Sequence, residues 1–467
     1  MPENRRSSSN PPLAGLGRLI VDATERYFPD AFVFALAAVI LAFIGGLLVG
    51  EHPGRLVMEF GEGFWGLVPF TMQMALVIIG GFVVASSPPL SRAIRALSGI
   101  PRTARGAVAF VAFFAMVSSM ISWGLSLVFT GFLVREVTRR VKGIDYRAVG
   151  AAAYLGLGSV WALGFSSSAA LMQATRSSIP PALLPTTGVI PLTETILLWQ
   201  NLTFAGILIA VSVAVAYYSC PRPEDARTAQ EMGVRFDPPV AEAKGSLTPA
   251  EKLGDSPIWG VTVGLILITY LVLLCREKGI TTAFDLNTFN LAFLGAGLIL
   301  HGKPRSFLSA VGRAVPATSG VLIQFPFYAG IFGIISKTAI ASVLAGWFVK
   351  ISTPGTFPIV VALYSAFLGI FVPSGGGKWI LEAPYVMASA NTWQVHLGWT
   401  VQIYNAAEAL PNLINPFWML PLMGILNVKA RDLAGYSILQ LIFHVPLVFF
   451  LAWLFAGTLV YHPPVIP

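Results

Sequence analysis

Four short stretches of small and polar residues interrupt otherwise apolar parts of the chain. Their residues are Ser122, Trp123 and Gly124; Phe165, Ser166, Ser167 and Ser168; Ser374, Gly375, Gly376, Gly377 and Lys378; and Asn412 and Asn415. A helix that restarts inside a membrane exposes backbone N–H groups at its N-terminus, and these groups attract anions. Glycine lets a carboxylate approach such amides because it has no side chain. With the hydroxyls, side-chain amides and aromatic neighbours, these residues predict a binding site for a small monocarboxylate with a short apolar tail.

Each of these residues also has a structural alternative. Serine in a membrane helix commonly bonds back to its own backbone, and glycine commonly serves close helix packing. For a single serine the two roles are equally reasonable. The four interruptions taken as a group favour a site.

Ionisable residues inside a membrane are costly and are functional candidates by default. Glu382 lies four residues after Lys378, so the two side chains can pair on one helix face. Either they neutralise each other, or Lys378 helps to hold the charge of the substrate. Glu408 lies one turn before Asn412 and can carry a proton if burial favours its neutral form; a position near the outer membrane interface is the alternative. Glu408 and Glu382 are the candidates for coupling.

The composition is that of a membrane protein. Hydrophobic residues make up 55% of the 467 and charged residues 11%, whereas a soluble domain carries about 25% charged residues. The net charge of +8 does not indicate nucleic-acid binding, because the basic residues lie in short loops between apolar runs. The histidines have no metal-ligand spacing, and no nucleophile motif is present. We therefore expect neither an enzyme nor a cofactor, with a proton or sodium as coupling ion.

The loops differ in basic residues, and this difference predicts the orientation. Of the 30 Lys and Arg, 23 fall in alternate loops that we assign to the cytoplasm together with the N-terminal tail, 1–29. The uncharged segment 106–134 has basic clusters at both ends but is too short to cross twice, since one span takes about 20 residues. It is predicted to be a re-entrant hairpin that turns near Ser122; one long span that breaks the charge rule is the alternative. Segment 358–390 is predicted to be a second hairpin, entering from outside.

A steady offset indicates an internal repeat. Gln73 and Gln324 lie before the two hairpins, Ser122 and Ser374 lie at their tips, and Ser166 and Asn415 lie in the next broken segments, always about 250 residues apart. The predicted organisation is a first transmembrane repeat (30–218), a cytoplasmic linker (219–256), an extra span (257–275) and a second repeat (286–460). Because the extra span reverses the second half, we expect an all-α multi-pass protein built from an inverted repeat.

Several longer motifs point to one transporter family. They are Gly61–Trp65, Met72–Leu76, Gln324–Ile331, Val372–Gly377 and Pro416–Trp418. Through them the chain resembles the AtoE family of short-chain fatty acid transporters over nearly its whole length. The resemblance implies uptake of butyrate-like acids or acetoacetate across a bacterial inner membrane. It also implies membership of the ion transporter superfamily, whose members use paired hairpins and often work as homodimers.

Three positions depart from the pattern of that family. Lys378 stands where the family usually has His, Glu382 where it has Gln, and Ser122 where it has Asn. The paired change at Lys378 and Glu382 is consistent with one interaction replacing another, and it leaves the exact acid and the coupling ion open.

The sequence thus predicts a secondary transporter in the lipid bilayer that carries a short-chain monocarboxylate inward with a proton. Two alternatives remain open at this stage. One is a sodium-coupled carrier of a C4-dicarboxylate, and the other is a passive anion channel.

Overall fold

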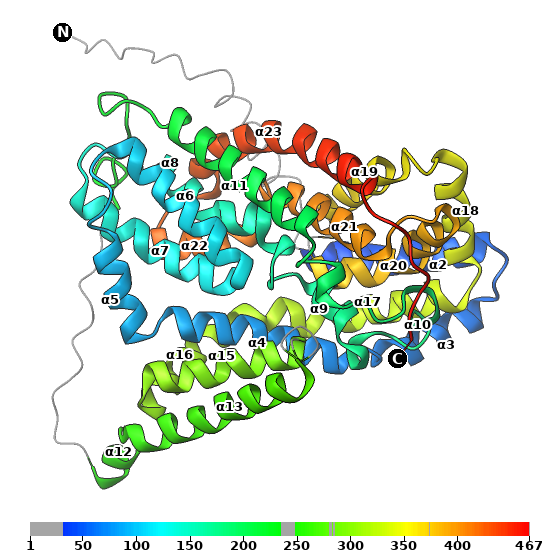
Figure 1. Ribbon diagram of the computed structural model, residues 1–467, viewed down its shortest axis with the longest axis horizontal. Helices are drawn as coiled ribbons and strands as arrows, with labels where there is room; N and C mark the ends of the chain where they lie inside the picture. The colour runs from blue at the N-terminus through cyan, green and yellow to red at the C-terminus, as the bar shows by residue number, and fades with distance from the viewer. Residues whose placement is uncertain (1–30, 235–247, 280–282, 284, 373, 467) are drawn as a thin grey trace.

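The computed structural model describes residues 31–234, 248–279, 283, 285–372 and 374–466. The predicted N-terminal tail and the middle of the predicted linker lie outside these residues. The described residues form helices and no strands, as expected (Figure 1). The helices up to the linker are α2 (Ala31–Leu48), α3 (Pro53–Phe64), α4 (Val68–Ala85), α5 (Pro88–Leu97), α6 (Ala104–Ile121), α7 (Trp123–Arg140), α8 (Tyr146–Leu155), α9 (Ser168–Ala174), α10 (Leu184–Thr187) and α11 (Trp199–Ser219).

The helices of the second half follow a short helix at the end of the linker. They are α12 (Pro249–Gly254), α13 (Pro257–Lys278), α15 (Leu286–His301), α16 (Pro304–Ala314), α17 (Ser319–Lys337), α18 (Ile340–Ile351), α19 (Phe357–Phe371), α20 (Gly375–Trp393), α21 (Leu397–Asn412), α22 (Pro416–Leu426) and α23 (Ala430–Ala456). Helices α4, α13, α15 and α16 lie side by side along one edge of the molecule (Figure 1).

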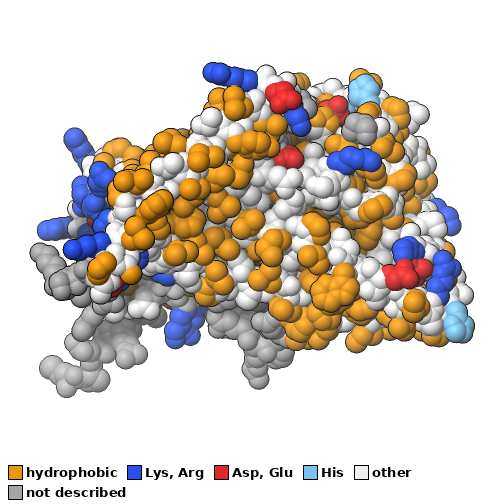
Figure 2. Space-filling model, turned by 90° about the horizontal axis from the view of Figure 1, so that it is seen from below, with side chains coloured by type: hydrophobic (Ala, Val, Ile, Leu, Met, Phe, Trp, Pro, Cys, Tyr) orange, Lys and Arg blue, Asp and Glu red, His pale blue; other side chains and the backbone are white. Residues whose placement is uncertain are grey.

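The protein is a multi-pass membrane protein. Within the described residues, seven helical stretches are long and apolar enough to cross a bilayer. The most apolar stretch contains α13, of which only 11% is buried. Figure 2 views the molecule from the side of this helix: hydrophobic side chains cover most of the middle of the face, and Lys and Arg are most numerous at its left end. An apolar band of this kind is suited to lipid.

The predicted hairpin segments are each two helices joined at a serine. The chain reverses at Ser122, whose extended backbone ends α6 and whose Oγ accepts from the amide of Leu125 in α7. The Ser126 hydroxyl of α7 donates to the carbonyl of Ala115 in α6 at 2.7 Å and so ties the two arms together. In the second segment Ser374 caps α20, and the hydroxyls of Tyr364 and Tyr385 join α19 to α20 at 2.8 Å.

Two further helices are interrupted. Helix α8 passes into a π turn at Gly156–Val160 and a 3-10 turn at Trp161–Leu163, and the chain then continues irregularly until α9 begins. Gly164 lies against the backbone of Met120 in α6, where a side chain would collide. Helix α21 ends at Asn412, and α22 starts at Pro416. Proline has no N–H and is suited to the first turn of a helix, so this residue marks the restart.

Some segments treated as loops in the sequence analysis are helices. Helices α3, α5 and α16 each begin with a proline in the first turn and bury only a narrow apolar face, which includes Leu56, Ile94 and Ala310. Each is too short to span a bilayer and carries charged residues, so it does not stand out in the sequence as a long apolar run. The inverted relation between the two halves stays a prediction.

Candidate transport site

The first hairpin tip and the first broken helix are joined by one serine. The backbone N–H of Trp123 donates to Ser166 Oγ at 2.7 Å, and the Ser166 hydroxyl donates to the carbonyl of Ser119 at 2.6 Å. Ser166 thus satisfies an amide that the start of α7 leaves without a partner inside the helix. The interruption at Gly164–Ser167 and the tip at Ser122 therefore form one unit.

The second hairpin tip packs against the same broken helix and against α21. A Cβ added to Gly375 would collide with the ring of Trp161, and one added to Gly376 would lie 2.9 Å from Phe70 and 3.2 Å from Ser168. The Tyr404 hydroxyl of α21 donates to the carbonyl of Gly375 at 2.5 Å. The tip needs glycine because neighbouring side chains leave no room for a Cβ at these positions.

The break between α21 and α22 completes the cluster. Tyr154 of α8 donates its hydroxyl to the carbonyl of Asn412 at 2.6 Å. Leu413 packs on Gly158 of the π turn. The rings of Trp123 and Trp418 lie 5.6 Å apart, edge to face. All four interruptions predicted from the sequence, two from each half, therefore meet in one place.

The start of α20 offers donors to an anion. Ser374 Oγ accepts from the amide of Gly377 at 3.2 Å, and the Ser374 carbonyl accepts from the amide of Lys378. The amides of Gly375 and Gly376 belong to the first turn, where a helix has no partner of its own for its N–H groups. The predicted arrangement of free amides at a glycine tip is therefore present.

Lys378 and Glu382 form a buried pair. Lys378 Nζ donates to the carbonyl of Ser365 at 2.7 Å, lies 3.3 Å from Glu382 Oε1, and lies 4.6 Å from the centre of the Tyr404 ring. The Ser365 hydroxyl donates to Glu382 Oε2 at 2.5 Å. Both charged side chains are fully buried. Since burial of an unpaired charge is very costly, the pair and Ser365 hold each other in place, and mutual neutralisation describes this conformation.

Glu408 lies in the interior of the molecule. Its side chain is 1% exposed, and the side chain of Asn412 faces its carboxylate, although without full hydrogen-bond geometry. Apart from this contact, the side-chain oxygen and nitrogen of Asn412, one turn further along α21, have no partner among the described residues. Lys378 and Glu382 are the charged groups close enough to act on Glu408. Buried polar groups without partners are rare and need an explanation.

The remaining predicted residues lie around this cluster in different roles. Ser167 Oγ caps α9 by accepting from the amide of Ala170, so its hydroxyl is already in use. Phe165 and Asn415 are half-buried, and Gly124 is buried against α4. The sequence analysis missed Ser365, Tyr404 and Trp161. None of them stands in a local motif, and only contacts between distant parts of the chain bring them to the site.

Comparison with known proteins gives the family. Residues 13–455 match the family model described as short chain fatty acid transporter. The chain is 33% identical over 437 residues to a protein of Escherichia coli (strain K12), covering 92% of this chain and 96% of that one. It is 30% identical over 441 residues to a protein of Haemophilus influenzae (strain ATCC 51907 / DSM 11121 / KW20 / Rd), covering 93% and 98%. Both relatives carry the name "Putative short-chain fatty acid transporter".

Solved structures give the fold. The YdaH transporter of Alcanivorax borkumensis superposes with a TM-score of 0.58 at 15% identity, covering 96% of this chain and 99% of that one. MtrF of Neisseria gonorrhoeae superposes with a TM-score of 0.59 at 13% identity, covering 97% and 100%. Both likenesses extend over nearly the whole chain. By its match to the family model and to both curated relatives, the chain belongs to the short-chain fatty acid transporter family.

Proposed function

We propose that this protein is a secondary active transporter that takes up short-chain monocarboxylates, such as butyrate or acetoacetate, together with a proton. The observation that carries the proposal is the fully buried carboxyl of Glu408, which forms no ion pair among the described residues and faces Asn412, close to Lys378 of α20. Family membership supplies the substrate class. The predicted location, a bacterial inner membrane with a cytoplasmic N-terminus, and the predicted homodimer and superfamily belong to this proposal.

The roles of the residues follow from their chemistry. The substrate carboxylate is bound by the amides of Gly375 and Gly376 and by the hydroxyl of Ser374, since helix N-termini favour anions. Lys378 is paired with Glu382 and so holds the start of α20 in place rather than binding the substrate charge. Trp123 and Phe165 provide apolar surface for the short tail. Ser166 holds the start of α7, and Ser168 lies against Gly376 of the tip. Because the tips are buried, access from either side requires the cluster to open alternately.

Proton coupling is favoured over sodium coupling by the surroundings of Glu408. An ionised carboxylate without a partner is far more costly to bury than a neutral carboxyl. Uptake of a proton therefore stabilises Glu408 in the occluded conformation, and its release accompanies opening to the cytoplasm. A C4-dicarboxylate would bring a second negative charge, but the one buried lysine of the cluster is already paired with Glu382. This pairing favours a monocarboxylate.

The experiment is uptake of radiolabelled butyrate and acetoacetate into proteoliposomes with imposed gradients. An acidic exterior should drive accumulation, a protonophore should abolish it, and a sodium gradient should have no effect. Protein-free liposomes and liposomes with the Gly376→Val variant control for passive entry of the neutral acid.

Three outcomes would contradict parts of the proposal. Uptake that follows a sodium gradient alone would exclude proton coupling. Equilibration without accumulation would indicate a channel. Uptake equal to that of protein-free liposomes for both acids would exclude this substrate class.

A further inference from the structure

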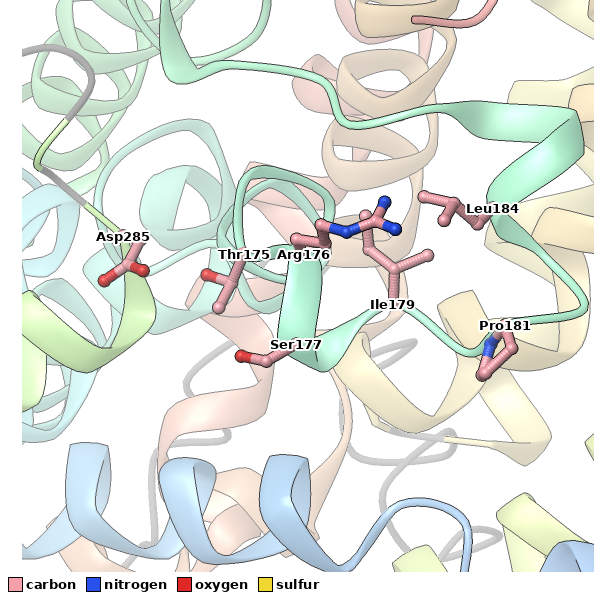
Figure 3. Close-up of a pocket in the computed structure, with 7 residues that line it drawn as sticks. All are labelled: Thr175, Arg176, Ser177, Ile179, Pro181, Leu184 and Asp285. Carbon is pink, nitrogen blue, oxygen red and sulfur yellow. The ribbon is translucent and has the colours of Figure 1, made fainter. Parts of the chain in front are cut away.

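An open cavity of about 580 Å³ lies at the end of α9, outside the cluster of interruptions. Figure 3 shows the residues around it. The lining residues are Thr175, Arg176, Ser177, Ile179, Pro181, Leu184 and Asp285. The volume is in the range of small-molecule sites, and it exceeds the needs of a four-carbon acid.

The cavity is one short helix away from the second hairpin tip. Helix α9 starts at Ser168, which packs on Gly376, and ends at Ala174. Its seven residues span roughly 10 Å at 1.5 Å per residue. Beyond it, Thr175 Oγ1 accepts from the backbone N–H of Leu286 at 3.1 Å, so the start of α15 forms a fixed wall.

The cavity contains a cation that is free to bind a ligand. Arg176 is exposed and forms no ion pair with any described carboxylate. Figure 3 shows its guanidinium extending over Ile179 toward Leu184, while the carboxylate of Asp285 lies on the other side of Thr175. That carboxylate accepts from the amides of Asn287 and Thr288 and caps α15. The Asp285 carboxylate is therefore already bound at the start of α15, whereas the Arg176 guanidinium has no carboxylate partner among the described residues.

The chemistry of the lining selects one kind of ligand. A guanidinium binds a carboxylate through paired N–H donors. Ile179, Pro181 and Leu184 place apolar surface next to it, and the Ser177 hydroxyl adds a polar group at the rim. A small anion with a short hydrocarbon tail satisfies both parts at once. Free phosphate or a dicarboxylate would leave the apolar wall unused.

We propose that this cavity is a second, outer site for short-chain monocarboxylates, where Arg176 captures the acid before it reaches the tip of α20. The inference deepens the proposed function and depends on it for the route of the ligand, but binding at the cavity can be measured by itself. Capture by an exposed cation raises the rate of encounter and weakens with salt.

The first test is kinetic. Arg176→Gln should raise the half-saturating butyrate concentration about three- to fivefold, as expected for an exposed ion pair, and leave the maximal rate unchanged. The dependence on ionic strength should become weaker. Arg276→Gln is the matched control, because Arg276 is an exposed arginine in the last turn of α13 and does not line the cavity. Equal half-saturation in the two variants would overturn the inference.

The second test measures occupancy without transport. Ser177→Cys is introduced into a chain with Cys220→Ala and Cys275→Ser, and detergent-solubilised protein is treated with a maleimide. Butyrate should slow the labelling of the new cysteine severalfold, whereas butylamine should not. Adding Arg176→Gln should remove the protection, and adding Gly206→Val, at a position where a Cβ meets nothing within 4 Å, should keep it.

The two tests separate failure of the site from failure of the proposed function. Labelling that is insensitive to butyrate would overturn the outer site even if uptake is normal. Protection that requires Arg176, in a protein that transports no short-chain acid, would support the site and contradict the transport proposal.

Discussion

At the scale of single residues, the site combines a fully paired charge with an unpaired one. Lys378 has Glu382, Ser365 and the ring of Tyr404 around it, whereas Glu408 forms no ion pair among the described residues and has the Asn412 side chain beside it. Each member of a buried pair compensates the charge of the other. An unpaired buried carboxyl changes its state when its surroundings open. This difference supports the proposal that Glu408, and not the pair, carries the proton.

Glu408→Gln should abolish accumulation driven by a pH gradient and spare exchange of labelled for unlabelled butyrate. Glutamine keeps the shape of the side chain but cannot release a proton at these pH values. The measurement is uptake and counterflow in proteoliposomes at several pH values. Glu224→Gln, in the exposed linker, is the control. An unchanged pH dependence in Glu408→Gln would exclude the proposed role.

The Lys378 and Glu382 pair should show strong coupling in stability. Removing one member of a buried pair typically costs about 3–5 kcal/mol, because the other charge is left without compensation. Lys378→His and Glu382→Gln should each lower the melting temperature in detergent, and the double variant should recover most of the loss. It also restores the residue types usual in the resembled family. Purely additive effects would show that the two side chains do not depend on each other.

At the scale of helices, the hairpin tip depends on close packing. The glycines at the start of α20 lie under aromatic rings, and the Ser374 hydroxyl caps the helix. The free amides at this tip are therefore kept inside the protein, where their interaction with an anion is stronger than in water. A tip of this kind tolerates little change in side-chain volume.

Gly376→Val should abolish transport while the protein remains in the membrane. The branched side chain would collide with Phe70 and Ser168 and move the tip away from its neighbours. Ser374→Ala should reduce transport less strongly, because it removes one capping bond worth about 1 kcal/mol. Gly206→Val is the control, since a Cβ at this position meets nothing within 4 Å. Normal uptake by both tip variants would remove the tip from the mechanism.

The positions of the helix breaks could be predicted from sequence, and their partners could not. Serine, glycine and proline act locally, so a break at Ser122 or Ser374 leaves a trace within a few residues. The bond from Ser365 to Glu382 spans 17 residues, and that from Tyr404 to Gly375 spans 29. Such contacts depend on how helices pack, which no local pattern encodes. Helices α5 and α16 could not be predicted from long apolar runs, because charged residues on their exposed faces interrupt such runs.

At the scale of the whole molecule, the four interruptions come from both halves of the chain and meet in its interior. Neither half contains the site alone. The long exposed face of α13 and the apolar band in Figure 2 surround this interior with surface suited to lipid. Movement of one half relative to the other would therefore change the site without unfolding either half.

The predicted orientation can be tested with single cysteines and a membrane-impermeant maleimide. In right-side-out vesicles, cysteines at Arg102 and Lys142 should react only after permeabilisation, because both ends of segment 106–134 are expected on the cytoplasmic side. A cysteine at Ser177 should react at once. Reaction of Arg102 and Lys142 from opposite sides would mean that the segment crosses completely, and the hairpin would then be wrong.

Tyr404 connects two parts of the site that are otherwise separate. Its hydroxyl is bonded to the backbone of the tip, its ring lies beside Lys378, and its helix carries Glu408 one turn further on. The tip cannot move away without either breaking that bond or pulling α21 along. The hydroxyl of Tyr404 thus links movement of the tip during solute entry to the change in surroundings of the Glu408 carboxyl. A Tyr404→Phe protein lacks this link and should transport solute without the coupled proton.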